Sequence, residues 1–149
     1  MWRFFLIILA VLILLSMAAY AVSLFLKLKR QKKQILQAKN ERYQRVSESI
    51  EIIVRAMLAE QCDLSEGVLR LKPLLDVLGK KLAEFPAMWA LYQVVEDMPI
   101  LDARKGLKRN ERMKLDLARE AKEAELEAAI KTELSQLLAQ IEQFKQELK

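Results

Sequence analysis

The hydrophobic pattern of the chain begins with one long apolar run. From Phe4 to Leu26 no residue is charged. As an α-helix this run spans about 34 Å at about 1.5 Å per residue, which is enough to cross a bilayer hydrocarbon core of about 30 Å. We therefore predict a transmembrane signal-anchor over residues 1–28, with residues 4–26 in contact with membrane lipid.

A cleaved signal peptide is the alternative interpretation of this run. The sequence Ala19-Tyr20-Ala21 fits the small-x-small pattern of a cleavage site. The apolar residues continue to Leu26, however, and the dense basic cluster that follows opposes translocation of the chain. The pattern favours the uncleaved anchor.

Basic residues are concentrated directly after the apolar run. Residues 27–45 hold eight Lys or Arg and one Glu, whereas Arg3 is the only charged side chain before the run. Because cytoplasmic flanks carry such an excess, we predict a single-pass protein of the bacterial inner (cytoplasmic) membrane, with the N-terminus periplasmic and the C-terminal domain cytoplasmic. The membrane-flanking cations are Lys27, Lys29, Arg30, Lys32 and Lys33. The helix-forming polar residues that continue from them predict a basic helical stalk over residues 29–45.

Apolar positions after the stalk recur at helical spacings. Val46, Ile50, Val54 and Met57 are separated by three or four residues, which is typical of a helix with one apolar face. The composition, with only three Gly and three Pro, argues against a β-sandwich or barrel. We predict an all-α fold, in which the N-terminal transmembrane helix continues into a small cytoplasmic helical domain over residues 46–128, followed by a long C-terminal helix.

Individual residues predict where the helices of this domain begin and end. Asp63 or Ser65 is a plausible N-cap, with Glu66 reaching back to it. Gly79 is expected to end that helix, and Pro73 is expected to kink it or split it in two. Pro86 is expected at the first position of the next helix.

The last segment, residues 129–149, has a heptad-like pattern. Extending its repeat backwards reaches Glu127 and Glu123, so the strict repeat does not continue. Two interpretations stay open: the helix packs on its own domain, or it pairs with a second copy in a homo-oligomer. The apolar positions are Ile130, Leu134, Leu137, Ile141, Phe144 and Leu148.

The residues that most catalytic sites need are scarce in this chain. It has no His and a single Cys, Cys62, which excludes most transition-metal sites, a Cys–His catalytic pair and an intrachain disulfide. No glycine-rich phosphate loop surrounds any of its three glycines. We expect no catalytic residue, no cofactor and no bound metal, and a small packing or capping role for Cys62.

One set of polar residues is a candidate ligand surface. Glu66 and Arg70 lie four residues apart and therefore share a helix face. Together with Asp63, Trp89 and Tyr92 they suggest a small-ligand site or an enzyme site, although such an ion pair is more often structural.

A second basic cluster, from Arg104 to Lys114, is a candidate partner surface. It fits a solvated helix start, contact with anionic headgroups or an acidic partner, or RNA or ribosome association. The lack of an interleaved aromatic residue disfavours nucleic acid. The cations are Arg104, Lys105, Lys108, Arg109, Arg112 and Lys114.

Three motifs resemble those of a bacterial family catalogued as domain of unknown function 2489. The central motif runs from Gln61 to Asp76 (QCDLSEGVLRLKPLLD), and the second runs from Phe85 to Tyr92 (FPAMWALY). The third comprises Asp102 to Lys105, Glu111 to Asp116, and Arg119 with Glu120. The resemblance covers about residues 1–130, and the family is also similar in its N-terminal apolar segment. It implies no activity, cofactor or partner.

Taken together, these features favour a membrane-anchored protein without enzymatic activity. We expect an adaptor or scaffold for a protein partner at the cytoplasmic membrane face. The alternatives are the ligand or enzyme site around Glu66, Arg70 and Tyr92, and RNA or ribosome association through Arg104–Lys114.

Overall fold

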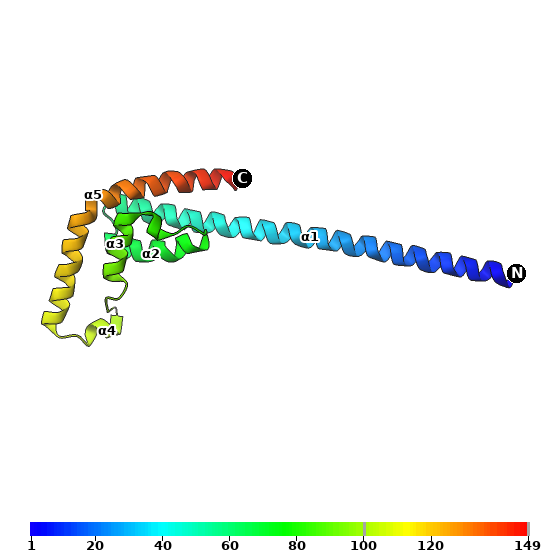
Figure 1. The fold of residues 1–149 in the computed structure, drawn as a ribbon, viewed down its shortest axis with the longest axis horizontal. Coiled ribbons are helices and arrows are strands. Elements are labelled where there is room, and N and C mark those ends of the chain that lie inside the picture. Colours follow the sequence, from blue (N-terminus) through cyan, green and yellow to red (C-terminus); the bar gives the residue numbers. More distant parts are fainter. Residues whose placement is uncertain (100, 149) are drawn as a thin grey trace. The chain divides into compact units, whose positions relative to one another are not determined.

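The structure is a computed structural model that describes residues 1–99 and 101–148, with the backbone alone at Leu101. Within this described part there is no β-strand, so the all-α prediction is confirmed. The elements in chain order are α1 (Trp2–Leu58), α2 (Leu64–Val77), the 3-10 helix η1 (Leu82–Glu84), α3 (Pro86–Val95), α4 (Leu101–Lys105) and α5 (Arg109–Glu147) (Figure 1).

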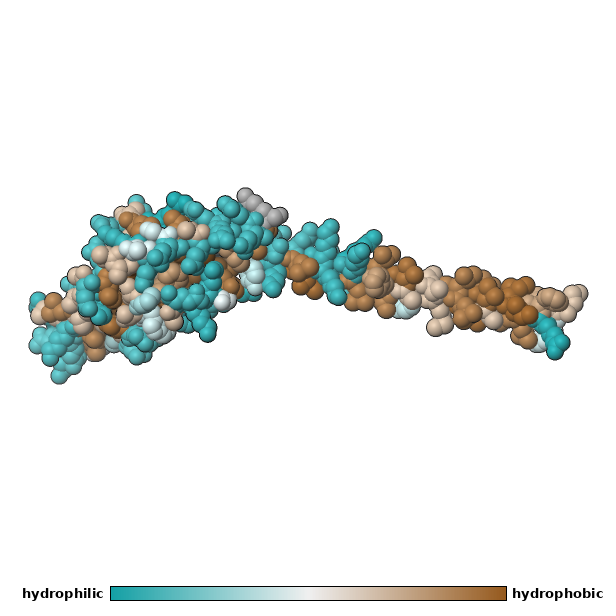
Figure 2. Space-filling model, turned by 45° about the horizontal axis from the view of Figure 1, so that its top comes forward, coloured by the Kyte–Doolittle hydropathy of each residue, from teal (hydrophilic) through white to brown (hydrophobic). Residues whose placement is uncertain are grey.

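The chain divides into two units, Met1–Glu41 and Arg42–Lys149. In the first unit every residue is exposed, including the whole apolar run. Figure 2 shows one face of this run, which is hydrophobic along most of the N-terminal part of α1. By its length and composition, α1 is the one helix in the described residues that could cross a membrane.

The second unit is a helical bundle with one hydrophobic core. The last turns of α1 contribute Ile50 and Val54, and both are fully buried. α2, α3 and α5 complete the core, mainly with Leu, Ile and Val. Gly67 of α2 lies so close to α1 that a Cβ atom at this position would overlap the side chain of Met57. The absence of a side chain at Gly67 therefore sets how closely these two helices approach.

The predicted apolar seam of α5 packs on its own domain. Ile130, Leu134, Leu137 and Ile141 are completely buried within this chain. Farther along, the ring of Phe144 lies 6.1 Å from that of Tyr43 on α1, and Leu148 is half-buried. The chain itself therefore covers the first four apolar positions of the seam, and pairing with a second copy stays a prediction. Lys149, the end of the predicted segment, lies outside the described residues.

Most of the predicted helix ends agree with the structure, but the expected split at Pro73 does not occur. Gly79 has a φ of 72° and follows α2, and the N–H groups of Gly79 and Lys80 donate to Asp76 and Leu75, which is a Schellman termination. Pro86 is at the start of α3. Pro73 lies inside a continuous α2, so the prediction that it splits the helix is wrong, and the predicted kink stays a prediction. The loss of its one N–H donor is tolerated near the helix end, where packing against the core stabilises the remaining turns.

Candidate functional site

Two glutamates of α5 cap the N-termini of two other helices. The Glu123 carboxylate accepts hydrogen bonds from the backbone N–H of Ser65, at 3.2 Å, and from the Ser65 hydroxyl. The Glu133 carboxylate accepts from the N–H groups of Ala87, at 2.8 Å, and Met88, at 2.9 Å. The first N–H groups of a helix have no partner within the helix, so α5 supplies the missing acceptors for both α2 and α3.

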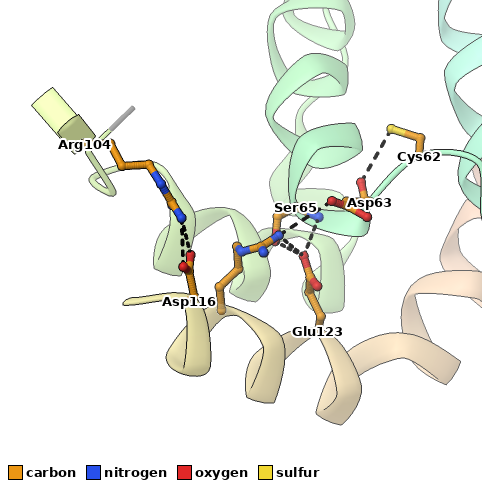
Figure 3. A network of polar contacts seen from close by, with 7 residues as sticks. Cys62, Asp63, Ser65, Arg104, Asp116 and Glu123 are labelled. Atoms are coloured by element: carbon orange, nitrogen blue, oxygen red, sulfur yellow. Dashed lines mark hydrogen bonds and ion pairs between the residues drawn. The ribbon is translucent and has the colours of Figure 1, made fainter. Parts of the chain in front are cut away.

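These contacts correct the predicted capping of α2. Asp63 occupies the N-cap position but makes no side-chain capping hydrogen bond. Its carboxylate lies 3.8 Å from the Arg119 guanidinium of α5, which also contacts Glu123 at 3.4 Å (Figure 3). Glu66 does not reach back to the cap, because its carboxylate pairs with Arg70 instead. The cap comes from another helix, with Arg119 holding the capping carboxylate in place.

A cavity of about 340 Å³ lies beside this network, at the end of α1. Four of its lining residues are glutamates, and Lys131 is the one cation among them. Lys131 donates to Glu127 at 2.7 Å and to Glu60 at 2.8 Å. These two bonds raise the pKa of Lys131, Glu127 contributing more, and the same ammonium lowers the pKa of Glu60. Lys131 thus forms one ion pair within α5 and a second, with Glu60, that joins α5 to the turn after α1.

Cys62 lines the same cavity. Its thiol lies 3.6 Å from the backbone carbonyl of Asp63, in position to donate to it (Figure 3). Burial raises the pKa of the Cys62 thiol above its ordinary value, and the nearby carboxylate of Glu66 raises it further. Because the thiolate is the nucleophilic form, this environment is that of a structural cysteine.

The other residues of the predicted ligand surface form two separate contacts. Glu66 and Arg70 pair with each other on the exposed surface. Trp89 and Tyr92 stack with their ring centroids 5.4 Å apart, and the Lys72 ammonium lies 5.9 Å from the centre of the Tyr92 ring. Neither pair lines the cavity beside Cys62 or the second cavity described next.

Part of the second basic cluster lines an open cavity of about 520 Å³ at the start of α5. Arg104 makes two 2.8 Å contacts with the Asp116 carboxylate (Figure 3), and Lys105 pairs with Asp102 at 2.9 Å. Arg109 and Arg112 line the cavity. Among the described residues neither of these two arginines has an acidic partner.

Four residues that hold these contacts were not predicted as site residues, although one of them, Arg119, lies in the third motif. They are Glu123, Glu133, Arg119 and Lys131. A signal for Glu123 was present, since extending the heptad repeat backwards placed a carboxylate where an apolar residue was due. No comparable signal marked Glu133, which lies beside the buried seam but off it. In the described residues no group of three or more His, Cys, Asp or Glu side chains is arranged to hold a metal ion.

Comparisons with known proteins agree with the family resemblance. A family described as "Protein of unknown function (DUF2489)" matches residues 14–137. A protein of Haemophilus influenzae, described as "Uncharacterized protein", is 51% identical over 140 residues, which is 94% of each chain. No solved structure matches. The resemblance predicted from the three motifs is confirmed.

Proposed function

From the premise that this chain belongs to the DUF2489 family, we propose that it is a single-pass membrane protein whose cytoplasmic helical domain acts as a non-enzymatic adaptor. The N-terminal part of α1 is the anchor, and residues 29–45 form a basic stalk. The domain from Arg42 onwards binds a protein partner. Confinement to the membrane surface raises the effective concentration of the two proteins, so modest contacts suffice for association.

The observation that carries this proposal is the complete exposure of the apolar run. A helix that is apolar around its whole circumference is stable when it is buried in protein or in lipid. None of the apolar window of α1 is buried in protein, and Phe5 and Phe25 are 80% and 69% exposed. A lipid bilayer is the environment that covers such a surface.

The basic residues after the run support the proposed orientation. Lys27, Lys29 and Arg30 follow Leu26 directly, while Arg3 alone precedes the run. Positive flanks stay on the cytoplasmic side during insertion. The domain that follows is therefore proposed to face the cytoplasm, and the N-terminus the periplasm.

The polar groups of the domain support a binding role over a catalytic one. Three of the four glutamates that line the cavity beside Cys62, namely Glu60, Glu123 and Glu127, are engaged in a helix cap or in ion pairs. The raised pKa of Cys62 keeps its thiol protonated near neutral pH. An exposed helical surface with unpaired arginines is instead suited to contact with another protein.

Reporter fusions at the C-terminus test the anchor and its orientation. We expect activity from a reporter that works only in the cytoplasm and none from one that works only in the periplasm. Replacing the five membrane-flanking cations by Gln, with two Lys added before Phe4, should invert part of the population. A matched variant with five cations of the second unit replaced should keep the original orientation. Activity of the periplasmic reporter on the unaltered chain would overturn the proposal.

A further inference from the structure

The first half of α5 leaves an apolar pair uncovered. Met113 and Leu117 are 56% and 59% exposed, and because they lie four residues apart they share one face of the helix. In the described part of the second unit, Ile52 of α1 is the other large apolar side chain that is exposed to this degree. Met113 and Leu117 also line the open cavity at the start of α5, so the apolar pair lies in a hollow.

Positive charge without an acidic partner in the described residues lies beside this apolar pair. From Arg104 to Lys114 the chain has six cations and one anion, Glu111. Arg104 and Lys105 are paired with carboxylates of their own chain. Arg109 and Arg112 are exposed and line the same cavity without an acidic partner in the described residues. Two guanidinium groups are therefore available beside two exposed apolar side chains.

The shape and charge of the hollow favour a polypeptide over a lipid surface. A membrane-surface helix presents a broad apolar face with bulky side chains, whereas here the face consists of two residues. Asp116, which also lines the cavity, is paired with Arg104, and Glu120 adds one anion to the lining. A polypeptide segment can place its carboxylates beside Arg109 and Arg112 and away from Glu120, whereas a uniformly anionic lipid surface cannot. An open hollow that brings two exposed apolar side chains together with two arginines is suited to an amphipathic segment.

We propose that Arg109, Arg112, Met113 and Leu117 form a docking surface for an acidic amphipathic segment of a partner protein. Apolar side chains of that segment pack on Met113 and Leu117, and its Asp or Glu carboxylates accept paired hydrogen bonds from the two arginines. This proposal rests on the adaptor function and specifies the chemistry of the partner. It leaves the identity of the partner to experiment.

Site-specific photo-crosslinking of the full chain tests the surface in cells that naturally make this protein. The photoreactive residue benzoylphenylalanine replaces Met113 in one variant, Leu117 in a second and Ile52 in a third, and the crosslinked peptides are sequenced. We expect crosslinks at Met113 and Leu117 to a protein segment rich in Asp or Glu and spaced apolar residues. Adding Arg109→Glu and Arg112→Glu should reduce the crosslink yield at least about tenfold, because the complementary charge is reversed.

Two controls are built into this experiment. One is a matched charge reversal away from the proposed surface, and the other is the exposed apolar position Ile52. Arg42→Glu with Arg45→Glu makes the same change in net charge on exposed residues of α1, and it should change the yield less than about twofold. Crosslinks to lipid, to RNA, or to a segment without acidic residues would overturn the docking proposal. Protein crosslinks at Ile52 alone would also overturn the docking proposal but would agree with the adaptor function. The absence of a protein crosslink at all three positions would contradict both the docking proposal and the adaptor function.

Discussion

The two halves of α5 have apolar residues at the same spacing but in different surroundings. In the second half, Ile130 and Leu134 are completely buried against the bundle. In the first half, Met113 and Leu117 are four residues apart in the same way and are more than half exposed. The ribbon changes direction between these halves (Figure 1), although α5 contains neither Pro nor Gly.

This difference shows that helical spacing predicts an apolar face but does not say what covers it. The second half is covered by α1, α2 and α3 of its own chain, and its stripe contributes to folding. The first half has no such cover in the described residues, so its stripe is available for binding. Mutations that separate stability from binding test this division directly.

The largest expected effect is that of removing a buried leucine from the second half. Leu134→Ala should lower the free energy of unfolding by about 2–5 kcal/mol, because it removes buried methyl groups and leaves a cavity. The matched change Leu117→Ala in the first half should alter it by less than about 0.5 kcal/mol. Urea unfolding of the full chain in detergent micelles, followed by circular dichroism, measures both. Equal losses in the two variants would contradict the assignment of the second half of α5 to folding and the first half to binding.

Removing a cross-helix cap should have the next largest effect. Glu133→Ala leaves the N–H groups of Ala87 and Met88 without their acceptor, and we expect a loss of about 1–3 kcal/mol in the free energy of unfolding. Glu142→Ala is the control, since Glu142 is an exposed glutamate in the same half of α5 whose one ion pair, with Arg55, is 3.4 Å long. An equal loss in Glu142→Ala and Glu133→Ala would show that the cap contributes no more to the free energy of unfolding than an exposed ion pair does.

Acidification should loosen the ion pairs that join the second half of α5 to α1. The Lys145 ammonium, 2.8 Å away, and then Arg55 lower the pKa of Glu51 below its ordinary value of 4.5. The ionised carboxylate therefore stabilises the fold above about pH 4.5, and this stabilisation is lost as the pH falls through the lowered pKa. Because both side chains are partly exposed, the effect should stay below about 1 kcal/mol.

The variant Glu51→Gln isolates this contribution to the pH dependence. Urea unfolding at about pH 7 and about pH 3 should show a smaller difference in the free energy of unfolding for the variant than for the unaltered chain. An unchanged difference would mean that the Glu51 pair contributes nothing to the acid sensitivity of the bundle.

The smallest effect on stability is expected from the proposed docking surface. Arg109→Glu with Arg112→Glu should change the free energy of unfolding by less than about 0.5 kcal/mol, because both arginines are exposed and without partners in the described residues. The same urea experiment measures it. Marked destabilisation would mean that these arginines stabilise the fold. A lower crosslink yield in the variant would then report unfolding of the domain and not loss of docking.

The sequence could predict the helix boundaries that are determined locally. Gly79 ends α2 and Pro86 begins α3 as expected, because a positive φ and a fixed φ near −65° are properties of those residues themselves. The buried face of the second half of α5 was also predictable, since its spacing is one-sided over several turns.

The remaining features depend on contacts between residues far apart in the chain. Glu133 caps α3 although forty-odd residues separate it from Ala87, and Gly67 is needed because Met57 of another helix lies against it. Neither fact has a local sequence signature. Pro73 is the reverse case, because α2 continues through it despite the local tendency of proline to end a helix.

The cross-helix caps also impose an order on assembly during synthesis. A chain leaves the ribosome from its N-terminus onwards, so the apolar run of α1 is complete long before Glu123 and Glu133 appear. Until then, α2 and α3 have the residues to form helices but lack the capping carboxylates for their first N–H groups. A nascent chain that is halted before residue 133 therefore has three of its four core-forming segments and no finished bundle. Folding of the domain is completed only after the last helix has been translated.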